Sequence, residues 1–325
     1  MSKFRILIAG NMVNQGFVTA RELRKLNVDV SLLMEKNPSL MSDPAYLDSN
    51  LKDNYPEWIY FFDKKNRNWK FDVIRIMRKF DLVHAWVEFP IFALLSGRPF
   101  IANTQGSDFR ELRRSKTFKG FLLNLAYKRS KIIIFNQPDY LNSDGKILKQ
   151  KGVFIPHIWD DTNWQKVEKF KKNTKLIIFH PANLEFRIKK NQNLLLGFEK
   201  YIKKYPDSRL IIVDRGVDSD NTHELVNRLK IQNNVEFIPG PLDKAKMVEF
   251  YTNSDIVADQ FGIGSMGTVA LESMLYGKPL IMYIDIESHR KLYGSVPPLV
   301  SARTPDEIYR GLVYLSEENE RIKIG

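Results

Sequence analysis

Short apolar runs rich in β-branched residues alternate along this chain with segments whose apolar positions recur at helical spacing. In the first half, the pattern predicts strands at 4–9, 28–34, 58–62, 82–87, 100–103 and 131–135, and helices at 18–26 and 120–130. In the second half, it predicts strands at 176–180, 209–214, 235–238, 255–259 and 280–284, and helices at 191–205, 222–231, 244–254, 267–276 and 305–318. This alternation is typical of parallel sheets in doubly wound α/β domains.

The rhythm of strands and helices is interrupted once, by the polar and charged segment 159–175. We therefore predict a first Rossmann-like domain at 1–158, a linker at 159–175 and a second Rossmann-like domain at 176–325. Two such domains facing each other form a cleft, and ligands of open α/β sheets bind at the carboxyl ends of the strands.

Composition narrows the class of protein. A chain of 325 residues with 43% hydrophobic residues can build two cores. It contains no cysteine, which excludes disulfides, thiolate metal sites and a cysteine nucleophile. The longest apolar runs, such as 91–95 and 132–135, are far too short to span a bilayer, and the start MSKFRILIAGN stops being apolar too soon for a signal peptide. We expect a cytoplasmic protein, soluble or peripheral at the inner membrane face.

The positive charge is concentrated in the first half of the chain. Residues 1–160 hold 26 basic and 16 acidic residues, a net of +10, whereas 161–325 hold 24 and 22, a net of +2. The stretch 113–131 interleaves basic and apolar residues without any acid and includes Arg113, Arg114, Lys116 and Lys119. This pattern suits an anionic membrane surface, although an ordinary amphipathic helix with a solvated basic face explains it equally well. The stretch contains no nucleic-acid-binding motif, so nucleic acid is not expected as a partner.

A glycine-rich loop joins the predicted strand 255–259 to the helix 267–276. Gly262, Gly264 and Gly267 free the backbone for close ligand approach, and the unpaired amides of the helix's first turn favour a phosphate. Glu272, one turn further along, could accept hydrogen bonds from a pair of sugar hydroxyls. Three glycines could also make no more than a tight strand-to-helix connection.

Three other segments follow predicted strands. Arg187, Lys189 and Lys190 lie on a predicted loop after 176–180, where fixed cations would neutralise a diphosphate unless they form only a solvated basic loop. The polar loop from Asn14 to Gly16 does not fit the dinucleotide fingerprint G-x-G-x-x-G. In IANTQGSDFREL, Ser107 and Asp108 either cap the next helix or contact a ligand.

Taken together, these motifs resemble the GT-B fold glycosyltransferases of the large retaining group called family four. DIVADQFGIGSMGTVALESMLYGKPLI resembles that group's donor-site segment, and HPANLEFRIKKNQNLLLGF resembles its diphosphate-clamping loop. VEFIPGPLDKAKMVEFYTNSDIV is similar to the segment that lines the nucleotide base, and KGVFIPHIWD resembles the strand that ends the first domain. The resemblance covers nearly the whole chain.

The resemblance implies roles for individual residues of a nucleotide-sugar donor site. Glu272 would hold the ribose, Arg187 and Lys190 the diphosphate, and Gly240 and Leu242 would lie beside the base. The backbone of Gly264, Ser265, Met266, Gly267 and Thr268 would approach the sugar and the phosphates. In the first domain, the loop with Asn14 and Gly16 would line the acceptor and donor face, and Gln105 would lie near the reacting carbon as part of the catalytic set.

The implied function is transfer of a sugar from a nucleotide-diphosphate donor to a glycan or lipid-linked acceptor, with retention and without a metal or other cofactor. Two residues depart from the group's pattern: Gly264 stands where a second glutamate contacts the donor sugar, and Gln105 stands where a histidine is common. Asp259 is a candidate substitute for that glutamate or a cap of the loop. The sequence ends where relatives usually continue into a helix returning to the first domain, so it is either truncated or closed differently. A nucleotide-sugar epimerase of the same fold and a catalytically weakened nucleotide-sugar-binding protein are the alternatives.

Overall fold

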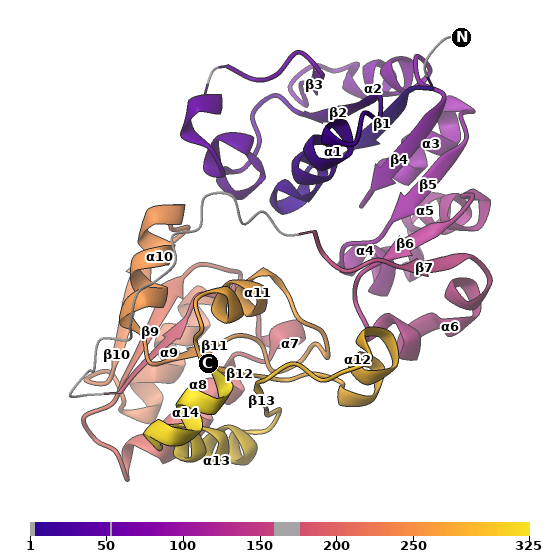
Figure 1. Cartoon of the computed structure of the whole chain (residues 1–325). Coiled ribbons are helices and arrows are strands. Elements are labelled where there is room, and N and C mark those ends of the chain that lie inside the picture. Colours follow the sequence, from indigo (N-terminus) through magenta and orange to yellow (C-terminus); the bar gives the residue numbers. More distant parts are fainter. Residues whose placement is uncertain (1–3, 53, 159–175) are drawn as a thin grey trace. The chain divides into compact units, whose positions relative to one another are not determined.

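The chain forms two compact units, Met1–Trp164 and Gln165–Gly325, each built around one parallel sheet. The computed structural model describes residues 4–52, 54–158 and 176–325 (Figure 1). The predicted linker 159–175 lies outside the described residues. The prediction of two doubly wound α/β sheets is confirmed, and the units, called unit 1 and unit 2 below, are described separately.

Unit 1 contains a seven-stranded sheet in which neighbouring strands pair in parallel. The strand order is β3-β2-β1-β4-β5-β6-β7. The chain therefore moves outward from β1 to β3, returns to β4 beside β1, and moves outward on the other side. Its strands are β1 (Ile6–Ala9), β2 (Val30–Glu35), β3 (Ile59–Phe62), β4 (Leu82–Trp86), β5 (Phe100–Asn103), β6 (Ile133–Phe135) and β7 (Gly152–Phe154).

Helices cover this sheet and bury their apolar positions against it. The α-helices are α1 (Gln15–Lys25), α2 (Trp69–Met77), α3 (Phe89–Ser96), α4 (Ser107–Arg110), α5 (Phe118–Arg129) and α6 (Tyr140–Lys151). Single 3-10 turns are η1 (Met12–Asn14), η2 (Leu40–Ser42), η3 (Pro44–Tyr46), η4 (Ser49–Leu51) and η5 (Leu112–Arg114). The apolar segments ILIA of β1 and VSLLME of β2 are almost entirely buried, as expected for central strands covered on both faces.

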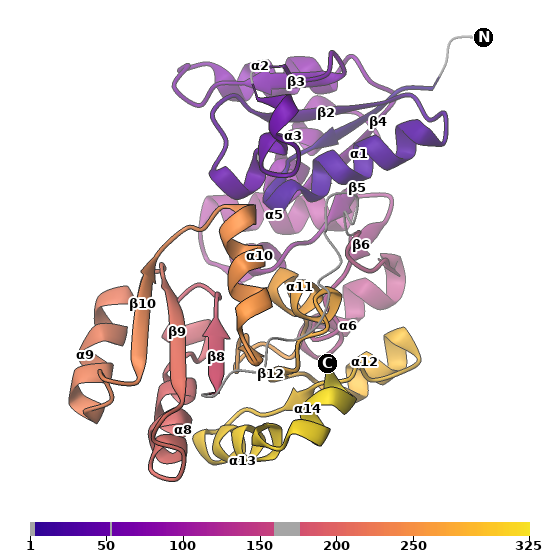
Figure 2. The same cartoon turned by 60° about the vertical axis from the view of Figure 1, so that its left-hand side comes forward.

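Unit 2 repeats this architecture with a six-stranded parallel sheet of order β10-β9-β8-β11-β12-β13. Figure 2 shows β10, β9 and β8 side by side. Its strands are β8 (Ile177–His180), β9 (Arg209–Asp214), β10 (Val235–Pro239), β11 (Ile256–Ala258), β12 (Leu280–Met282) and β13 (Val300–Ser301). Its helices are α7 (Phe186–Lys189), α8 (Gln192–Ile202), α9 (Ser219–Leu229), α10 (Lys244–Asn253), α11 (Thr268–Leu275), α12 (Ile286–Tyr293), α13 (Pro305–Ser316) and α14 (Glu318–Ile324).

The core of unit 2 joins both ends of its sequence. Phe198 on α8 and Ile308 and Leu312 on α13 are fully buried in one apolar cluster. Helix α13 begins with a capping box, in which the Thr304 side chain accepts from the Glu307 amide and the Glu307 carboxylate accepts from the Thr304 amide. The sheet is thus covered both by α8, in its first connection, and by α13, which follows its last strand.

Several elements escaped the sequence prediction. Helix α3 has the sequence FPIFALLS, which is apolar all round and carries no helical periodicity, because the helix is buried on most sides. Helix α6 contains glycine, asparagine, serine and aspartate, which are weak helix formers, and α2 and α12 were also missed. The predicted loop with Arg187 and Lys189 instead contains the helical turn α7. No helix among the described residues is both long and apolar enough to cross a membrane.

Candidate functional site

The strand order of unit 2 reverses between β8 and β11, and this point is where an open α/β sheet offers a ligand crevice. Two connections leave the carboxyl ends of these neighbouring strands, 181–191 after β8 and 259–267 after β11. They are joined by a hydrogen bond from the Phe261 amide to the Lys189 carbonyl at 2.8 Å. A Cβ atom at Gly262 would lie 2.0 Å from the Ile188 carbonyl oxygen, so only glycine permits this approach. The two predicted ligand loops are therefore one packed unit.

Gln260 holds the glycine loop in shape from inside. Its Oε1 accepts from the Gly262 amide at 3.0 Å, and its Nε2 donates to the carbonyls of Ser265 and Tyr283, both at 3.1 Å. Gln260 is almost fully buried. The side-chain amide of Gln260 thus hydrogen-bonds backbone groups of the glycine loop and the backbone just after β12 at the same time. These bonds hold the loop in one conformation without a ligand. Sequence reasoning missed this residue, which directly follows the predicted strand 255–259.

The loop leads into the first turn of α11. Gly267 is the N-cap residue of α11, and no side chain among the described residues caps that turn. A Cβ atom at Gly267 would meet no described atom within 4 Å. The amides of this turn, including that of Thr268, can therefore donate to an anion at the positive end of the helix dipole.

Tight packing against a distant segment explains why position 264 is a glycine, which the sequence did not reveal. Its carbonyl accepts from the Asp285 amide at 3.0 Å, and a Cβ atom at Gly264 would lie 2.9 Å from the Cβ of Asp285. A glutamate at position 264 would therefore require Asp285 and its segment to move. Ser265 is buried, and Met266 is partly exposed beside it.

Glu272 lies one turn into α11 and is 9% exposed. Its Oε2 accepts from the Tyr251 hydroxyl at 2.7 Å. Burial raises the pKa of Glu272 from its ordinary value of 4.5 to about 7, although the Tyr251 hydrogen bond and the charge of Arg215 oppose the shift. With this pKa, the Glu272 carboxyl group is half ionised near neutral pH. A ligand that is cationic or rich in hydroxyl groups would stabilise its ionised form.

The cations of the 181–191 connection differ in environment. Arg187 and Lys190 are exposed, and Arg187 Nη2 lies 3.9 Å from Glu185 Oε1. Lys189 is only partly exposed, and burial lowers its pKa while the charge of Asp259 opposes this. Burial raises the pKa of Asp259 to about 6, with Lys189 again acting in the opposite sense. Asp259 is therefore electrostatically coupled to Lys189. Arg187 and Lys190, the two residues predicted to bind the diphosphate, face solvent in unit 2.

Arg215 is a further cation that sequence reasoning missed. It follows β9, and its Nη2 donates to the Pro181 carbonyl at 3.0 Å. Its charge favours the ionised form of Glu272 and disfavours the protonated forms of Lys189 and His180. The signal was available, because an arginine directly after the strand RLIIVD lies at the carboxyl edge of a parallel sheet.

His180 and Asn191 connect β8 to the 181–191 connection. His180 Nδ1 donates to the Ala258 carbonyl at 2.8 Å, and its Nε2 accepts from Asn191 Nδ2 at 2.9 Å. Asn191 Oδ1 in turn accepts from the Glu185 amide at 2.8 Å. Burial lowers the pKa of His180 to about 4, which keeps the ring neutral in this relay. This histidine has a structural role.

Gly240 and Leu242 lie on the connection from β10 to α10. Leu242 is buried, and a Cβ atom at Gly240 would lie 2.6 Å from a methyl group of Val213 and 3.1 Å from the Cδ of Arg215. Gly240 therefore lies beside the same arginine that influences Glu272. The role of the two residues next to a nucleotide base stays a prediction.

In unit 1, Asn14 is 2% exposed and its side chain is used internally. Its Oδ1 accepts from Asn11, and its Nδ2 donates to the carbonyls of Met41 and Asp43 at 3.1 and 2.7 Å. Gly16 allows α1 to approach the Gly10 carbonyl, which a Cβ atom would meet at 2.1 Å. Both predicted catalytic residues thus hold the β1–α1 connection in place, which explains their occurrence without a ligand.

Gln105 lies on the connection from β5 to α4. Its amide donates to Asp108 Oδ1 at 3.0 Å, and Asp108 Oδ2 accepts from the Tyr127 hydroxyl at 2.6 Å. Of the two alternatives for Ser107 and Asp108, the capping role is wrong, because the N-cap of α4 is Gly106 and no side chain caps it; the ligand role stays a prediction. Gln105 Nε2 is buried and has no hydrogen-bond partner among the described residues, so it can still donate to a ligand.

The predicted membrane-surface residues separate into two groups. Arg114 and Lys116 are exposed, as expected. Arg113 is only 6% exposed, and the Lys119 ammonium pairs with the Glu88 carboxylate. The prediction is wrong for the exposure of Arg113, because its guanidinium packs over the ring of Phe109. Among the described residues, no group of three or more His, Asp or Glu side chains could hold a metal ion.

Comparison with known proteins finds a family match for the second half of the chain. Residues 160–295 match the family described as Glycosyl transferases group 1. An uncharacterized glycosyltransferase of Haemophilus influenzae is 30% identical over 143 residues, covering 38% of this chain and 39% of that protein. The match thus spans about two fifths of this relative's length.

Two solved structures resemble nearly the whole chain. The crystal structure of HepE from Anabaena in complex with UDP and glucose has a TM-score of 0.71 at 14% identity, covering 99% of this chain and 92% of that one. A putative UDP-N-acetylglucosamine 2-epimerase from Listeria monocytogenes has a TM-score of 0.57 at 10% identity, covering 99% and 91%. At these identities the likeness concerns the fold. The chain therefore has the GT-B fold, and its segment 160–295 matches the family described as Glycosyl transferases group 1.

Proposed function

We propose that this protein is a glycosyltransferase that transfers a sugar from a nucleotide-diphosphate donor to a glycan or lipid-linked acceptor. The observation that carries the proposal is the carboxyl edge of the sheet at β8 and β11, where the first turn of α11 has no side-chain cap, Lys190 lies against the glycine loop, and Glu272 is buried one turn behind. HepE, which shares the fold, was crystallised with UDP and glucose, and this supports a nucleotide-sugar donor.

In this proposal the donor diphosphate lies over the first turn of α11. The amides from Gly264 to Thr268 donate to phosphate oxygens, and the exposed Arg187 and Lys190 approach from the neighbouring connection. Negative charge grows on the diphosphate as its bond to the anomeric carbon breaks. Fixed cations and oriented amides stabilise that charge, so a resident metal ion is not required for this step.

Glu272 would accept hydrogen bonds from the two ribose hydroxyls in its ionised form. Because its pKa is about 7 in the ligand-free protein, donor binding should strengthen as pH rises through neutrality. Retention of the anomeric configuration is part of the proposal and rests on the family alone.

The epimerase alternative has the fold similarity in its favour. Epimerases of this fold usually use histidines as well as carboxylates in acid–base chemistry, so the carboxyls of Glu272 and Asp259, with pKa values of about 7 and 6, do not meet this need alone. Burial lowers the pKa of His84, His157 and His180 to about 4, and each ring contacts side-chain or backbone partners. We therefore favour sugar transfer.

The test is nucleotide release from a panel of UDP- and GDP-sugars, with and without candidate acceptors. Release that depends on acceptor supports transfer, formation of an epimer without acceptor supports the alternative, and tight binding without any turnover supports a binding protein. The double variant Arg187→Ala/Lys190→Ala should reduce turnover by about 100-fold or more, in line with the loss of charge-assisted contacts to a leaving group.

A matched control removes two exposed cations from the end of α8 in the same unit, Lys203→Ala/Lys204→Ala. Both double variants should keep the thermal stability of the parent protein, because all four side chains are exposed. Equal turnover by the two variants would contradict the proposed diphosphate site.

A further inference from the structure

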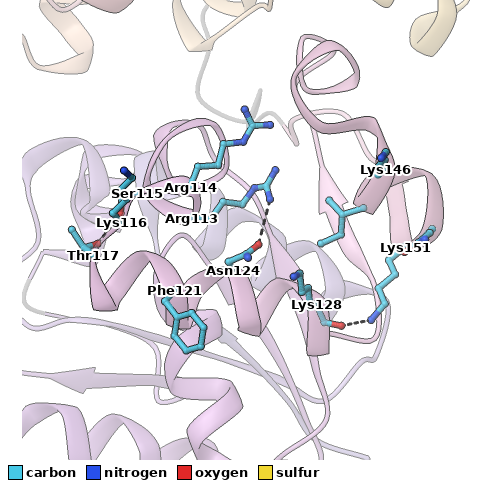
Figure 3. Close-up of a pocket in the computed structure, with 12 residues that line it drawn as sticks. Arg113, Arg114, Ser115, Lys116, Thr117, Phe121, Asn124, Lys128, Lys146 and Lys151 are labelled. Carbon is cyan, nitrogen blue, oxygen red and sulfur yellow. Dashed lines mark hydrogen bonds between the residues drawn. The ribbon is translucent and has the colours of Figure 1, made fainter.

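Unit 1 carries a second candidate site, a basic pocket of about 830 Å³ that the sequence only partly anticipated. It lies between η5, α5 and the later turns of α6 (Figure 3). The lining residues that the structure describes include six basic side chains and no acidic one: Arg113, Arg114, Lys116, Lys128, Lys146 and Lys151. Lys146 and Lys151 come from α6, a helix that the sequence pattern did not predict.

Two of these cations, Arg113 and Lys151, hydrogen-bond to the segments that surround the pocket. The buried Arg113 donates from Nε to the Phe109 carbonyl at 2.9 Å, and its Nη1 reaches Asn124 Oδ1 on α5 at 3.5 Å. Lys151 Nζ donates to the carbonyls of Lys128 and Ser130 at 2.5 and 3.0 Å, which fastens the end of α6 to the end of α5. The pocket is thus held open by hydrogen bonds rather than by chance side-chain positions.

The other cations face solvent. Lys116, Lys128 and Lys146 are all exposed and come from three different segments that converge on the pocket. Like charges gathered at one place repel each other unless an anion binds among them. A phosphate group, with several acceptor oxygens and a net negative charge, has the matching chemistry.

Exposed aromatic residues beside the pocket favour the phosphate of a lipid headgroup over a soluble phosphate. Phe118 and Phe121 on α5 are 77% and 61% exposed, and Phe121 lines the pocket itself. They are three residues apart, so they lie on the same face of the helix. Exposed phenylalanines beside lysines are typical of surfaces that enter the interface of an anionic membrane, whereas a soluble phosphate would need no such rings.

We propose that the basic pocket and the Phe118–Phe121 face form a docking surface for anionic membranes, with a phospholipid headgroup phosphate held between α5 and α6. Lys116, Lys128 and Lys146 contact phosphates of the leaflet, and the two rings enter the headgroup layer. This inference concerns unit 1 and does not depend on the proposed function of unit 2.

The test is co-sedimentation of the full chain with phosphatidylcholine vesicles that contain or lack phosphatidylglycerol. We expect binding only to the anionic vesicles, with affinity that falls as salt rises. The variant Lys116→Glu/Lys128→Glu/Lys146→Glu should lower partitioning by about 100-fold or more, since each basic residue near such a surface contributes about 1 kcal/mol. Phe118→Ser/Phe121→Ser should weaken binding without removing its salt dependence.

The matched control is Lys65→Glu/Arg67→Glu/Lys79→Glu, which makes the same charge change at exposed residues of unit 1 outside the pocket. Equal loss of binding in this variant would overturn the proposal, because net charge alone would then explain the attraction. The proposal also fails if anionic vesicles are not bound while inorganic phosphate or RNA binds and protects the pocket lysines from acetylation. Circular dichroism and thermal unfolding of all three variants verify that they are folded.

Discussion

Glu272→Gln is expected to stabilise the ligand-free protein at alkaline pH while weakening nucleotide binding. Burial raises the pKa of Glu272 from 4.5 to about 7, so the unfolded chain loses this proton at lower pH than the folded protein does. Stability contributed by this group therefore falls as pH rises from the unfolded pKa to the folded one. At about 1.36 kcal/mol per pKa unit, the loss between pH 5 and pH 8 is about 2.5 kcal/mol.

Glutamine removes this pH dependence without changing the shape of the side chain, and its oxygen can still accept from Tyr251. Any fixed cost of burying the amide is the same at both pH values and cancels in the comparison. The unfolding free energy of the variant relative to the parent should therefore rise by about 2.5 kcal/mol from pH 5 to pH 8. Its nucleotide affinity should fall by about tenfold or more, since a hydrogen bond to a charged group contributes about 1.5–3 kcal/mol.

Urea unfolding followed by far-UV circular dichroism measures the effect, and tryptophan fluorescence provides an internal control. Residues 176–325 contain no tryptophan, and Trp58, Trp69 and Trp86 lie in unit 1. Any transition that fluorescence alone detects should be unchanged in the variant. A stability difference between variant and parent that is equal at pH 5 and pH 8 would refute the reasoning, because Glu272 could not then have a raised pKa.

Three further substitutions test the neighbouring groups. Tyr251→Phe removes the hydrogen bond that favours the ionised carboxylate, so the pKa of Glu272 should rise further and the onset of nucleotide binding should move to higher pH, as calorimetric titration over a pH series would reveal. An unchanged pH profile would separate Glu272 from binding. Gly262→Ala should destabilise the protein by several kcal/mol, on the order of an overpacked core site, because its Cβ would lie 2.0 Å from a carbonyl oxygen. Gly267→Ala, where a Cβ meets nothing within 4 Å, should cost less than about 1 kcal/mol in thermal unfolding, and equal losses for both glycines would contradict the packing argument.

The strand pattern was readable from sequence because the central strands of a parallel sheet are buried on both faces. The segments FIAN of β5 and RLIIVD of β9 were predicted with the bounds that the structure has. The glycine loop before α11 was readable because glycine spacing between a strand and a helix is a local signal. Helix α3 was missed because its burial on most sides erases the polar face that marks a surface helix.

Other features depend on contacts between residues far apart in sequence. Position 264 requires glycine because Asp285, 21 residues later, packs against it. Arg113 was expected to be exposed because it lies in a basic stretch of the sequence. In the structure its guanidinium is buried, because it packs over the ring of Phe109 and contacts Asn124. Phe109 is only four residues from Arg113, but Asn124 is 11 residues from it and Asp285 is 21 residues from Gly264, so no spacing rule along one helix predicts these two contacts.

Two parallel α/β sheets, a glycine loop opening a helix and a basic first half were all predictable from the order of residues, since each follows from local periodicity, glycine placement or charge counting. The raised pKa of Glu272, the influence of Arg215 and Lys189 on the buried carboxylates, and the lysines that α6 adds to the basic pocket all depend on the folded arrangement. Desolvation and charge coupling are set by the distant segments that pack around a group, and these neighbours come together only when the chain folds.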